Sequence, residues 1–182
     1  LMLPNRQIHL DFHTSGLIDP VGDEFDPEAF GRAFKEAHVQ SVCLFTRCHH
    51  GYCYYPTNVG TMHPGLHGRS LLDEQIRALD EVGVAYSLYT TICWDELSAK
   101  NHPERLYRDR EGKPAKSDAE TGRRVGEDEP GWTSLCYNGG YRDFIHAHVR
   151  EVCERYRVKE FFLDIVSGHP CLCDECRASM AE

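Results

Sequence analysis

The sequence predicts an α/β fold, and three observations support this. Segments with strand character alternate with segments of helical periodicity in the order βαβαβαβ, which is typical of parallel strands joined by right-handed crossovers. No glycine-rich phosphate loop follows the first strand, which favours a barrel over a nucleotide-binding sheet. A complete (β/α)₈ barrel needs about 250 residues. The 182 residues therefore predict one partial domain over residues 1–182, the N-terminal half of a TIM barrel truncated after its fourth strand.

Each element has its own local signal. Asp26 is a suitable N-cap, and Pro27 is suited to the first position of the first helix. The second helix has apolar residues at helical spacing and ends at Gly83. The strands are short runs rich in apolar and β-branched residues. The expected strands span residues 7–12, 41–46, 84–92 and 160–166, and the expected helices span residues 27–38, 71–82 and 141–156.

Two other parts of the chain have a distinct character. Residues 95–137 are polar and interrupted by glycine and proline, and connections of this length are unusual without a functional reason. The chain begins with Leu1, and residues 177–182 resemble the first turn of a helix without a stop signal. These ends predict that the sequence is a fragment of a longer protein.

The composition excludes several classes of protein. The net charge of −9, from 20 basic and 29 acidic residues, disfavours a nucleic-acid partner, because the phosphate backbone would be repelled. No apolar run reaches the roughly 20 residues of a membrane span, and the residues before the first strand lack the basic-then-apolar pattern of a signal peptide. Nine scattered cysteines, an odd number, favour free thiols in a reducing compartment, so we expect a cytoplasmic protein. The oligomeric state is left open.

The first two strand ends carry histidines. His9, Asp11 and His13 alternate, which places them on one face of the first strand. We expect His9 and Asp11 to satisfy each other structurally and His13, at the strand's end, to be functional. After the second strand, His49 and His50 precede Tyr52, and this combination suits sugar recognition by hydroxyl contacts and stacking. Solvent-facing histidines on an aromatic rim are the equal alternative.

The later strand ends carry carboxylates. Trp94, Asp95 and Glu96 follow the third strand, where an aromatic platform beside acids suits a sugar site, but adjacent acids also suit a helix N-terminus. Asp164 is the one carboxylate in the apolar fourth strand. Burial of an unpaired carboxylate is costly, so we expect Asp164 to be catalytic. The alternative is an ion pair with a core arginine such as Arg47.

A cysteine cluster follows the fourth strand. His169, Cys171, Cys173 and Cys176 have the residue types of a structural zinc site, although no second CxxC pair accompanies them. Free thiols beneath a loop and a local disulfide are the alternatives. We expect no metal or other cofactor in the reaction, and a structural zinc ion stays an open possibility.

Three stretches resemble a known family. CHHGYCYYP resembles the KHHDGF-type segment of α-L-fucosidases, VAYSLYTTICWDE resembles their third strand, and YRDFIHAHVREVCERYRVKEFFLDI resembles the helix and strand that deliver their nucleophile. With MHPGL and CLCDEC included, the sequence is most similar to the putative glycosyl hydrolases called hypothetical glycosyl hydrolase family 6. Cys48 replaces the lysine of the fucosidase pattern, and the aspartate after its histidine pair is absent, so the sugar is left open.

The resemblance implies an enzyme that cleaves an O-glycosidic bond of a carbohydrate by a retaining mechanism. It makes Asp164 the nucleophile and Trp94 part of the sugar-binding pocket. The residues that it implies bind sugar hydroxyls are His13, His49 and His50. We add Tyr52 to the predicted substrate-binding residues because it follows the histidine pair in the same loop. It also places the acid/base residue in the later part of the barrel, beyond Glu182. We therefore expect the isolated chain to be catalytically incomplete.

Two other functions remain as alternatives. A metal-dependent hydrolase on a similar barrel would use His9, His13 and Asp164 as ligands, because imidazole and carboxylate suit zinc or manganese. A non-catalytic carbohydrate-binding domain would keep the aromatic rim without the chemistry.

Overall fold

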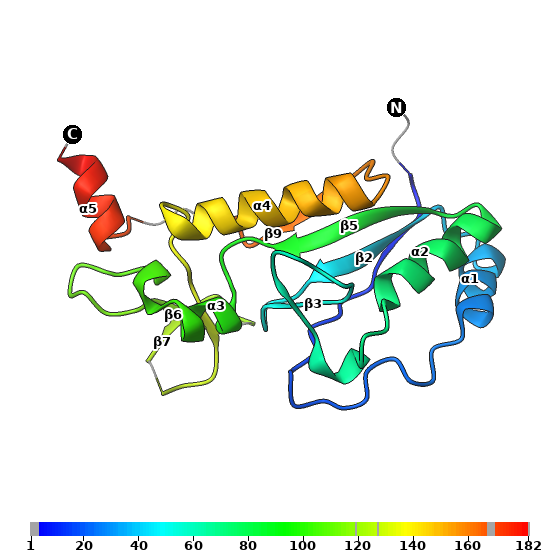
Figure 1. Ribbon diagram of the computed structural model, residues 1–182, viewed down its shortest axis with the longest axis horizontal. Helices are drawn as coiled ribbons and strands as arrows, with labels where there is room; N and C mark the ends of the chain where they lie inside the picture. The colour runs from blue at the N-terminus through cyan, green and yellow to red at the C-terminus, as the bar shows by residue number, and fades with distance from the viewer. Residues whose placement is uncertain (1–3, 119, 127, 167–169, 182) are drawn as a thin grey trace.

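In the main sheet, the spatial order of four parallel strands is the same as their order in the sequence. The computed structural model describes residues 4–118, 120–126, 128–166 and 170–181. Residues 7–9, 41–47, 85–91 and 161–164 form four parallel strands, and three pairings join them in this order (Figure 1). Two short strands, β3 and β4, extend the sheet beside the end of β2, with β3 antiparallel to it. The strands are β1 (Gln7–His9), β2 (Ser41–Arg47), β3 (Tyr52–Cys53), β4 (Thr61–Met62), β5 (Ala85–Thr91) and β9 (Phe161–Asp164).

The helices between the strands begin and end where their signals predict. Asp26 caps the first helix by accepting a hydrogen bond from the Ala29 amide at 3.0 Å. Gly83 ends the second helix with φ 71°, a conformation in which glycine avoids a side-chain clash. The first two helices pack against each other (Figure 1). The helices are α1 (Pro27–Glu36), α2 (Leu71–Val82), α3 (Glu96–Asn101), α4 (Gly140–Arg155) and α5 (Asp174–Met180), with 3₁₀ turns at Pro64–Leu66 and Pro103–Arg105.

The two faces of the sheet differ in what they contact. Thr46 of β2 faces α4, where its Oγ1 lies 3.3 Å from Nε2 of the buried His148. Its neighbour Phe45 points the other way and stacks on Tyr89 at 3.8 Å, with His9 beside it at 5.5 Å. Helix α4 therefore covers one face, and aromatic rings gather on the other. The polar strand ends lie at the carboxyl edge of this aromatic face.

The long polar segment has structure of its own. Between α3 and α4 it forms a small antiparallel sheet from β6 (Lys116–Ser117), β7 (Arg124–Val125) and β8 (Trp132–Thr133). Figure 1 places this sheet, α3 and α5 at one end of the molecule, away from α1 and α2. The segment therefore supplies side chains beside the carboxyl ends of β5 and β9.

Some expectations need correction. The first strand is shorter than residues 7–12, because its parallel pairing with β2 ends at His9. The last helix begins earlier than expected, at Asp174. The expected half barrel is confirmed only as a mixed α/β fold with a parallel sheet, and the described residues form no closed barrel. In the described part of the chain, no helix combines the length and apolar character needed to cross a membrane.

Candidate functional site

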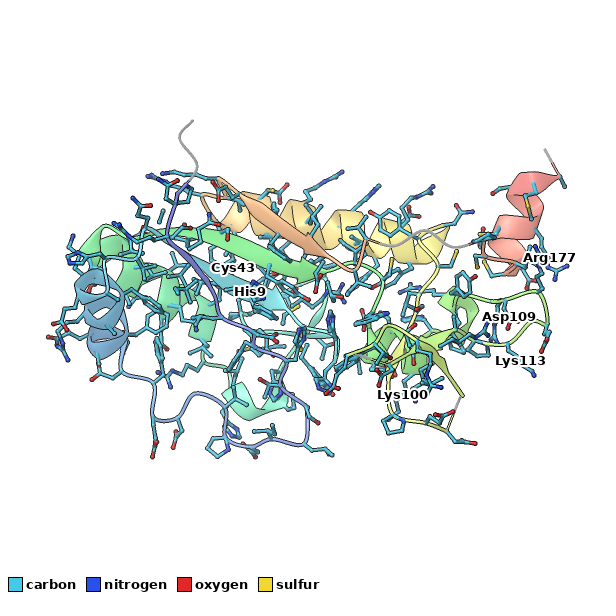
Figure 2. All side chains as sticks on the ribbon, turned by 180° about the vertical axis from the view of Figure 1, so that it is seen from behind. His9, Cys43, Lys100, Asp109, Lys113 and Arg177 are labelled. Atoms are coloured by element: carbon cyan, nitrogen blue, oxygen red, sulfur yellow. The ribbon has the colours of Figure 1, made fainter. Side chains whose placement is uncertain are left out.

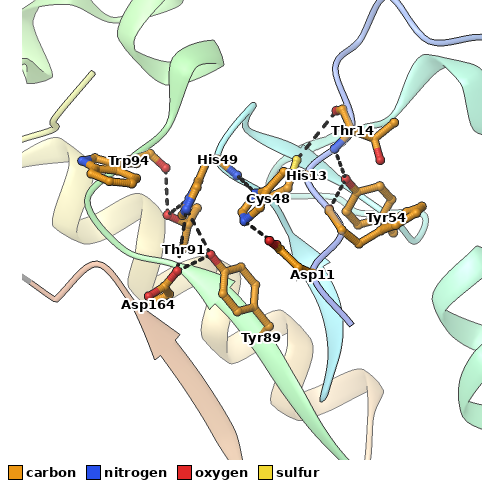
Figure 3. Close-up of polar contacts among 11 residues, drawn as sticks. Asp11, His13, Thr14, Cys48, His49, Tyr54, Tyr89, Thr91, Trp94 and Asp164 are labelled. Carbon is orange, nitrogen blue, oxygen red and sulfur yellow. Dashed lines mark hydrogen bonds and ion pairs between the residues drawn. The ribbon is translucent and has the colours of Figure 1, made fainter. Parts of the chain in front are cut away.

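Asp164 lies at the carboxyl end of β9, opposite Thr91 of β5 (Figure 3). Its side chain is 30% exposed, and its Oδ2 accepts a hydrogen bond from the Tyr89 hydroxyl at 2.7 Å. Burial raises the pKa of Tyr89 well above its ordinary value, and the bond to Asp164 adds to the shift, so Tyr89 stays a donor. His49 Nε2 lies 3.7 Å from the same carboxylate oxygen.

The hydrogen bonds around His49 assign its tautomer. The Thr91 hydroxyl donates to the Trp94 carbonyl at 2.9 Å, so its oxygen accepts from His49 Nδ1, also at 2.9 Å. The proton of His49 is then on Nδ1, and Nε2 presents a lone pair beside Asp164. Burial, followed by the nearby His13 and Arg47, lowers the pKa of His49 to about 3. His49 is therefore neutral and can accept a hydrogen bond from a hydroxyl group.

His13 packs directly on His49. The two rings stack with centroids 3.9 Å apart, and the His49 amide donates to His13 Nδ1 at 3.1 Å. Nε2 of His13 donates to Asp11 at 3.1 Å, so Asp11 pairs with His13 and not with His9. Burial lowers the pKa of His13, and the charges of Asp11 and Asp164 partly oppose the shift. His13 thus orients the loop that carries His49.

Two tryptophans enclose this group. Trp94 and Trp132 lie edge-on to His49 at 5.0 and 5.1 Å and stack on each other at 6.3 Å. His50 packs its ring against Trp132 at 4.8 Å. Trp132 is not among the site residues predicted from the sequence, although it is one of two tryptophans in the chain and lies in the long segment expected to carry function.

Tyr52 contacts a different part of the molecule. Its ring lies 5.1 Å from that of His63, and its hydroxyl approaches the backbone at Gly16. A role for Tyr52 in sugar binding stays a prediction.

The carboxylates after β5 have structural partners. Asp95 pairs with the fully buried Arg47 and caps α3 by accepting from the Ser98 amide at 2.8 Å. Arg47 thus pairs with Asp95 and not with Asp164, which removes the ion-pair interpretation of Asp164. Glu96 accepts a hydrogen bond from the Thr133 hydroxyl at 3.1 Å and so holds β8, with Trp132, beside the site.

Asp164 and Trp94 both line a cavity of about 780 Å³, between the end of β9, the small sheet and the segment before α5. Ile165, which also lines it, has φ 54°. A β-branched residue rarely adopts this conformation, which costs roughly 1–3 kcal/mol and is concentrated at functional sites. Another cavity, of about 550 Å³ along α4, contains none of the predicted site residues.

The described residues do not gather the ligands of the alternative metal-dependent hydrolase. His9 is surrounded by rings, with Phe162 at 5.0 Å, and both ring nitrogens of His13 have partners in Asp11 and His49. The side chains that do gather at metal-binding distances are Cys136, Cys171, Cys173 and Cys176. The structure thus adds Cys136 to the predicted cluster, and His169 lies outside the described residues.

Solved structures of fucosidases share this arrangement of strands and helices. The α-L-fucosidase isoenzyme 2 of Paenibacillus thiaminolyticus is 34% identical, with a TM-score of 0.87 over 98% of this chain and 26% of that one. The α-L-fucosidase of Bacteroides thetaiotaomicron is 21% identical, with a TM-score of 0.56 over 80% of this chain and 28% of that one. The α-fucosidase of Thermotoga maritima is 18% identical, with a TM-score of 0.55 over 87% of this chain and 32% of that one. The last two show similarity of fold.

The chain spans about a quarter of the length of the Paenibacillus enzyme. No curated protein matches the sequence. Residues 26–165, which include α1 and extend through Asp164, match a family model described as hypothetical glycosyl hydrolase 6. The chain belongs to the family called hypothetical glycosyl hydrolase 6.

Proposed function

We propose that the protein containing this chain is a retaining glycoside hydrolase of the α-L-fucosidase type, with Asp164 as its nucleophile. The observation that carries the proposal is the setting of Asp164. Its carboxylate ends a parallel strand, lines a large cavity, accepts a hydrogen bond from the neutral Tyr89 and lies beside the neutral His49. None of the described side chains forms an ion pair with this carboxylate through a lysine or arginine, so no such pair competes with its attack on an anomeric carbon.

The contacts of Asp164 also select the attacking oxygen. Tyr89 and His49 both lie against Oδ2, which leaves Oδ1 to bond to the anomeric carbon. In the first step this bond forms as the glycosidic bond breaks, and the departing oxygen takes a proton from a general acid. In the second step water attacks the same carbon and releases Asp164, giving its proton to the same group. We assign that group to the part of the barrel beyond Glu182, as the resemblance implies.

Carbohydrate recognition would come from the residues around the carboxylate. His49 Nε2 presents a lone pair to a sugar hydroxyl, and Trp94 supplies an aromatic wall of the cavity. His13 and His50 support this group through His49 and Trp132, respectively. The similarity to the Paenibacillus α-L-fucosidase supports fucose as the first sugar to test.

The strand order supports the N-terminal half of a (β/α)₈ barrel. Strands β1, β2, β5 and β9 follow one another in a single direction, whereas a doubly wound sheet reverses its order. The two edge strands expose apolar side chains: Ile8 of β1 is 40% exposed and Phe162 of β9 is 47% exposed. Further strands at both edges would cover these residues.

Chemical rescue in the full-length protein tests the proposal. Asp164→Gly should abolish hydrolysis of an aryl α-L-fucoside, and added azide should restore release of the aryl group, because azide fits the space that the carboxylate leaves. The product should be a fucosyl azide with inverted anomeric configuration. Asp23→Gly, at an exposed aspartate before α1, is the control and should hydrolyse normally. Full hydrolysis by Asp164→Gly without azide would exclude Asp164 as the nucleophile.

A further inference from the structure

Four cysteine sulfurs meet at the end of the molecule where α5 lies. Cys136 precedes α4, whereas Cys171, Cys173 and Cys176 surround the start of α5, and all four Sγ atoms lie within 4.8 Å of one another. Figure 2 shows Arg177 of α5 at this end, near Asp109 and Lys113. The Leu172 amide also donates to the Arg108 carbonyl at 2.8 Å. The cluster therefore joins segments that are distant in the sequence.

The distances between the sulfurs fit a shared metal ion. The Sγ atoms of Cys136 and Cys176 lie 3.4 Å apart, and all four cysteines are free thiols. A disulfide needs about 2.05 Å. Four thiolates at about 2.3 Å from a tetrahedral zinc ion lie roughly 3.8 Å apart. The Cys136–Cys176 separation exceeds the disulfide bond length, and the upper limit of 4.8 Å for the whole set accommodates the tetrahedral value.

Hydrogen-bond donors surround the sulfurs in positions that would stabilise thiolates. The amides of Arg108 and Cys173 point at Cys171 Sγ from 3.4 and 3.5 Å, and the Asn138 side-chain amide points at Cys176 Sγ from 3.8 Å. Hydrogen bonds of this kind orient metal-bound ligands and stabilise their charge. Cys153, by comparison, is exposed on α4 and lies outside the cluster.

We propose that Cys136, Cys171, Cys173 and Cys176 bind one zinc ion as four thiolates. Four protein ligands close the coordination sphere, so the ion is structural and does not activate water. Binding exchanges the thiol protons for the metal, so up to one proton is released by each cysteine. Soft thiolate ligands in a tetrahedral set select zinc or iron over magnesium, calcium or manganese.

The zinc ion would stabilise one wall of the candidate active site. Cys136, Cys171 and Cys176 line the same cavity as Asp164 and Ile165. By joining the start of α5 to the loop before α4, the ion fixes this wall without contacting the carboxylate. The inference does not depend on the proposed hydrolase activity.

Metal analysis of the full-length protein, purified without chelators, tests the proposal. We expect one zinc per chain by elemental analysis. Replacement by cobalt should give the intense thiolate-to-cobalt charge-transfer band and the visible bands of tetrahedral coordination. Cys136→Ser should lose at least nine-tenths of the metal, whereas the control Cys153→Ser should retain it.

If Cys136→Ser fails to fold, alkylation of the thiols in the unsubstituted protein provides a second test. In the natural protein the four cluster thiols should resist alkylation until a strong chelator removes the metal. Stoichiometric iron in place of zinc would overturn the choice of metal. A metal-free protein whose four thiols react at once, or whose intact mass shows a disulfide among them, would overturn the site.

Discussion

Asp95 and Asp164 occupy comparable places in the fold but have opposite surroundings. Each lies at or just after the carboxyl end of a parallel strand, Asp95 after β5 and Asp164 on the neighbouring β9. The Asp95 side chain is 1% exposed, pairs with Arg47 and caps a helix. The Asp164 side chain is 30% exposed and has neutral partners.

This difference separates a structural carboxylate from the proposed nucleophile. A buried ion pair is rigid, and the charge of Asp95 is compensated by Arg47 whether or not a substrate is present. The charge of Asp164 is uncompensated by any described cation, lies beside a cavity and is oriented by one phenol hydrogen bond. Both carboxylates share this strand position, so the proposed role of Asp164 depends on its partners and not on its position alone.

The largest expected effect is a loss of activity when Asp164 is replaced, which would distinguish it from the structural Asp95. Asp164→Asn in the full-length protein should lower kcat by roughly 10⁴-fold or more, the order seen when a nucleophilic residue is removed. Its melting temperature should change little, because Asn can still accept the Tyr89 hydrogen bond. Steady-state kinetics and thermal unfolding measure the two effects. Substantial activity in this variant would remove the distinction between the two carboxylates.

The next largest effect is a loss of stability when Asp95 is replaced. Asp95→Asn keeps the helix cap but leaves Arg47 buried and unpaired, so the free energy of unfolding should fall by about 3–5 kcal/mol. Denaturant unfolding measures this loss. The matched control is Glu28→Gln, which breaks an exposed pair with Arg32 and should cost less than about 1 kcal/mol. Equal losses from both variants would show that the buried pair is not structural.

His49→Phe tests whether His49, beside Asp164, contributes to substrate binding. Phenylalanine keeps the ring packing against His13 and the tryptophans but removes the acceptor at Nε2. Leaving a buried hydroxyl unpaired costs roughly 1–3 kcal/mol, so kcat/KM should fall by about 5- to 150-fold. His67→Asn, at an exposed histidine paired with Asp19, is the control and should leave kcat/KM unchanged. An unaltered kcat/KM in His49→Phe would exclude His49 from substrate binding.

The smallest effect concerns pH. In the folded protein the pKa of His49 is about 3, below its ordinary value of 6.5. Between these values the unfolded chain binds one more proton at this position, so acid destabilises the fold by about 1.4 kcal/mol per pH unit. His49→Phe should show a slope of unfolding free energy against pH, from pH 6 to 4, that is smaller by about this amount. Identical slopes would show that His49 titrates normally.

Local signals predicted the regular part of the fold well. The Asp26 cap, the Gly83 stop and the helical spacing of α2 are short-range features, and the structure has all three. Asp164 stood out because one carboxylate interrupts an apolar strand. Its place at a strand end, beside His49 and Trp94, followed from the alternation of strands and helices.

Long-range pairing could not be predicted in the same way. Trp132 reaches the site because Glu96 holds the neighbouring Thr133, and Cys136 meets cysteines 35–40 residues later in the chain. The partner of Arg47 was equally hidden, since Asp95 and Asp164 both lie near ends of adjacent strands. Local sequence contains no signal for such contacts, because loop paths and side-chain directions decide them.

Covalent trapping tests the central claim most directly. The full-length protein would be incubated with a panel of 2-fluoro glycosyl fluorides that includes the fucosyl compound, digested, and its peptides analysed by mass spectrometry. The account predicts a single fucosyl adduct on Asp164, and no adduct in Asp164→Asn. An adduct on another carboxylate, or efficient turnover of a natural fucoside with inversion of configuration, would contradict it.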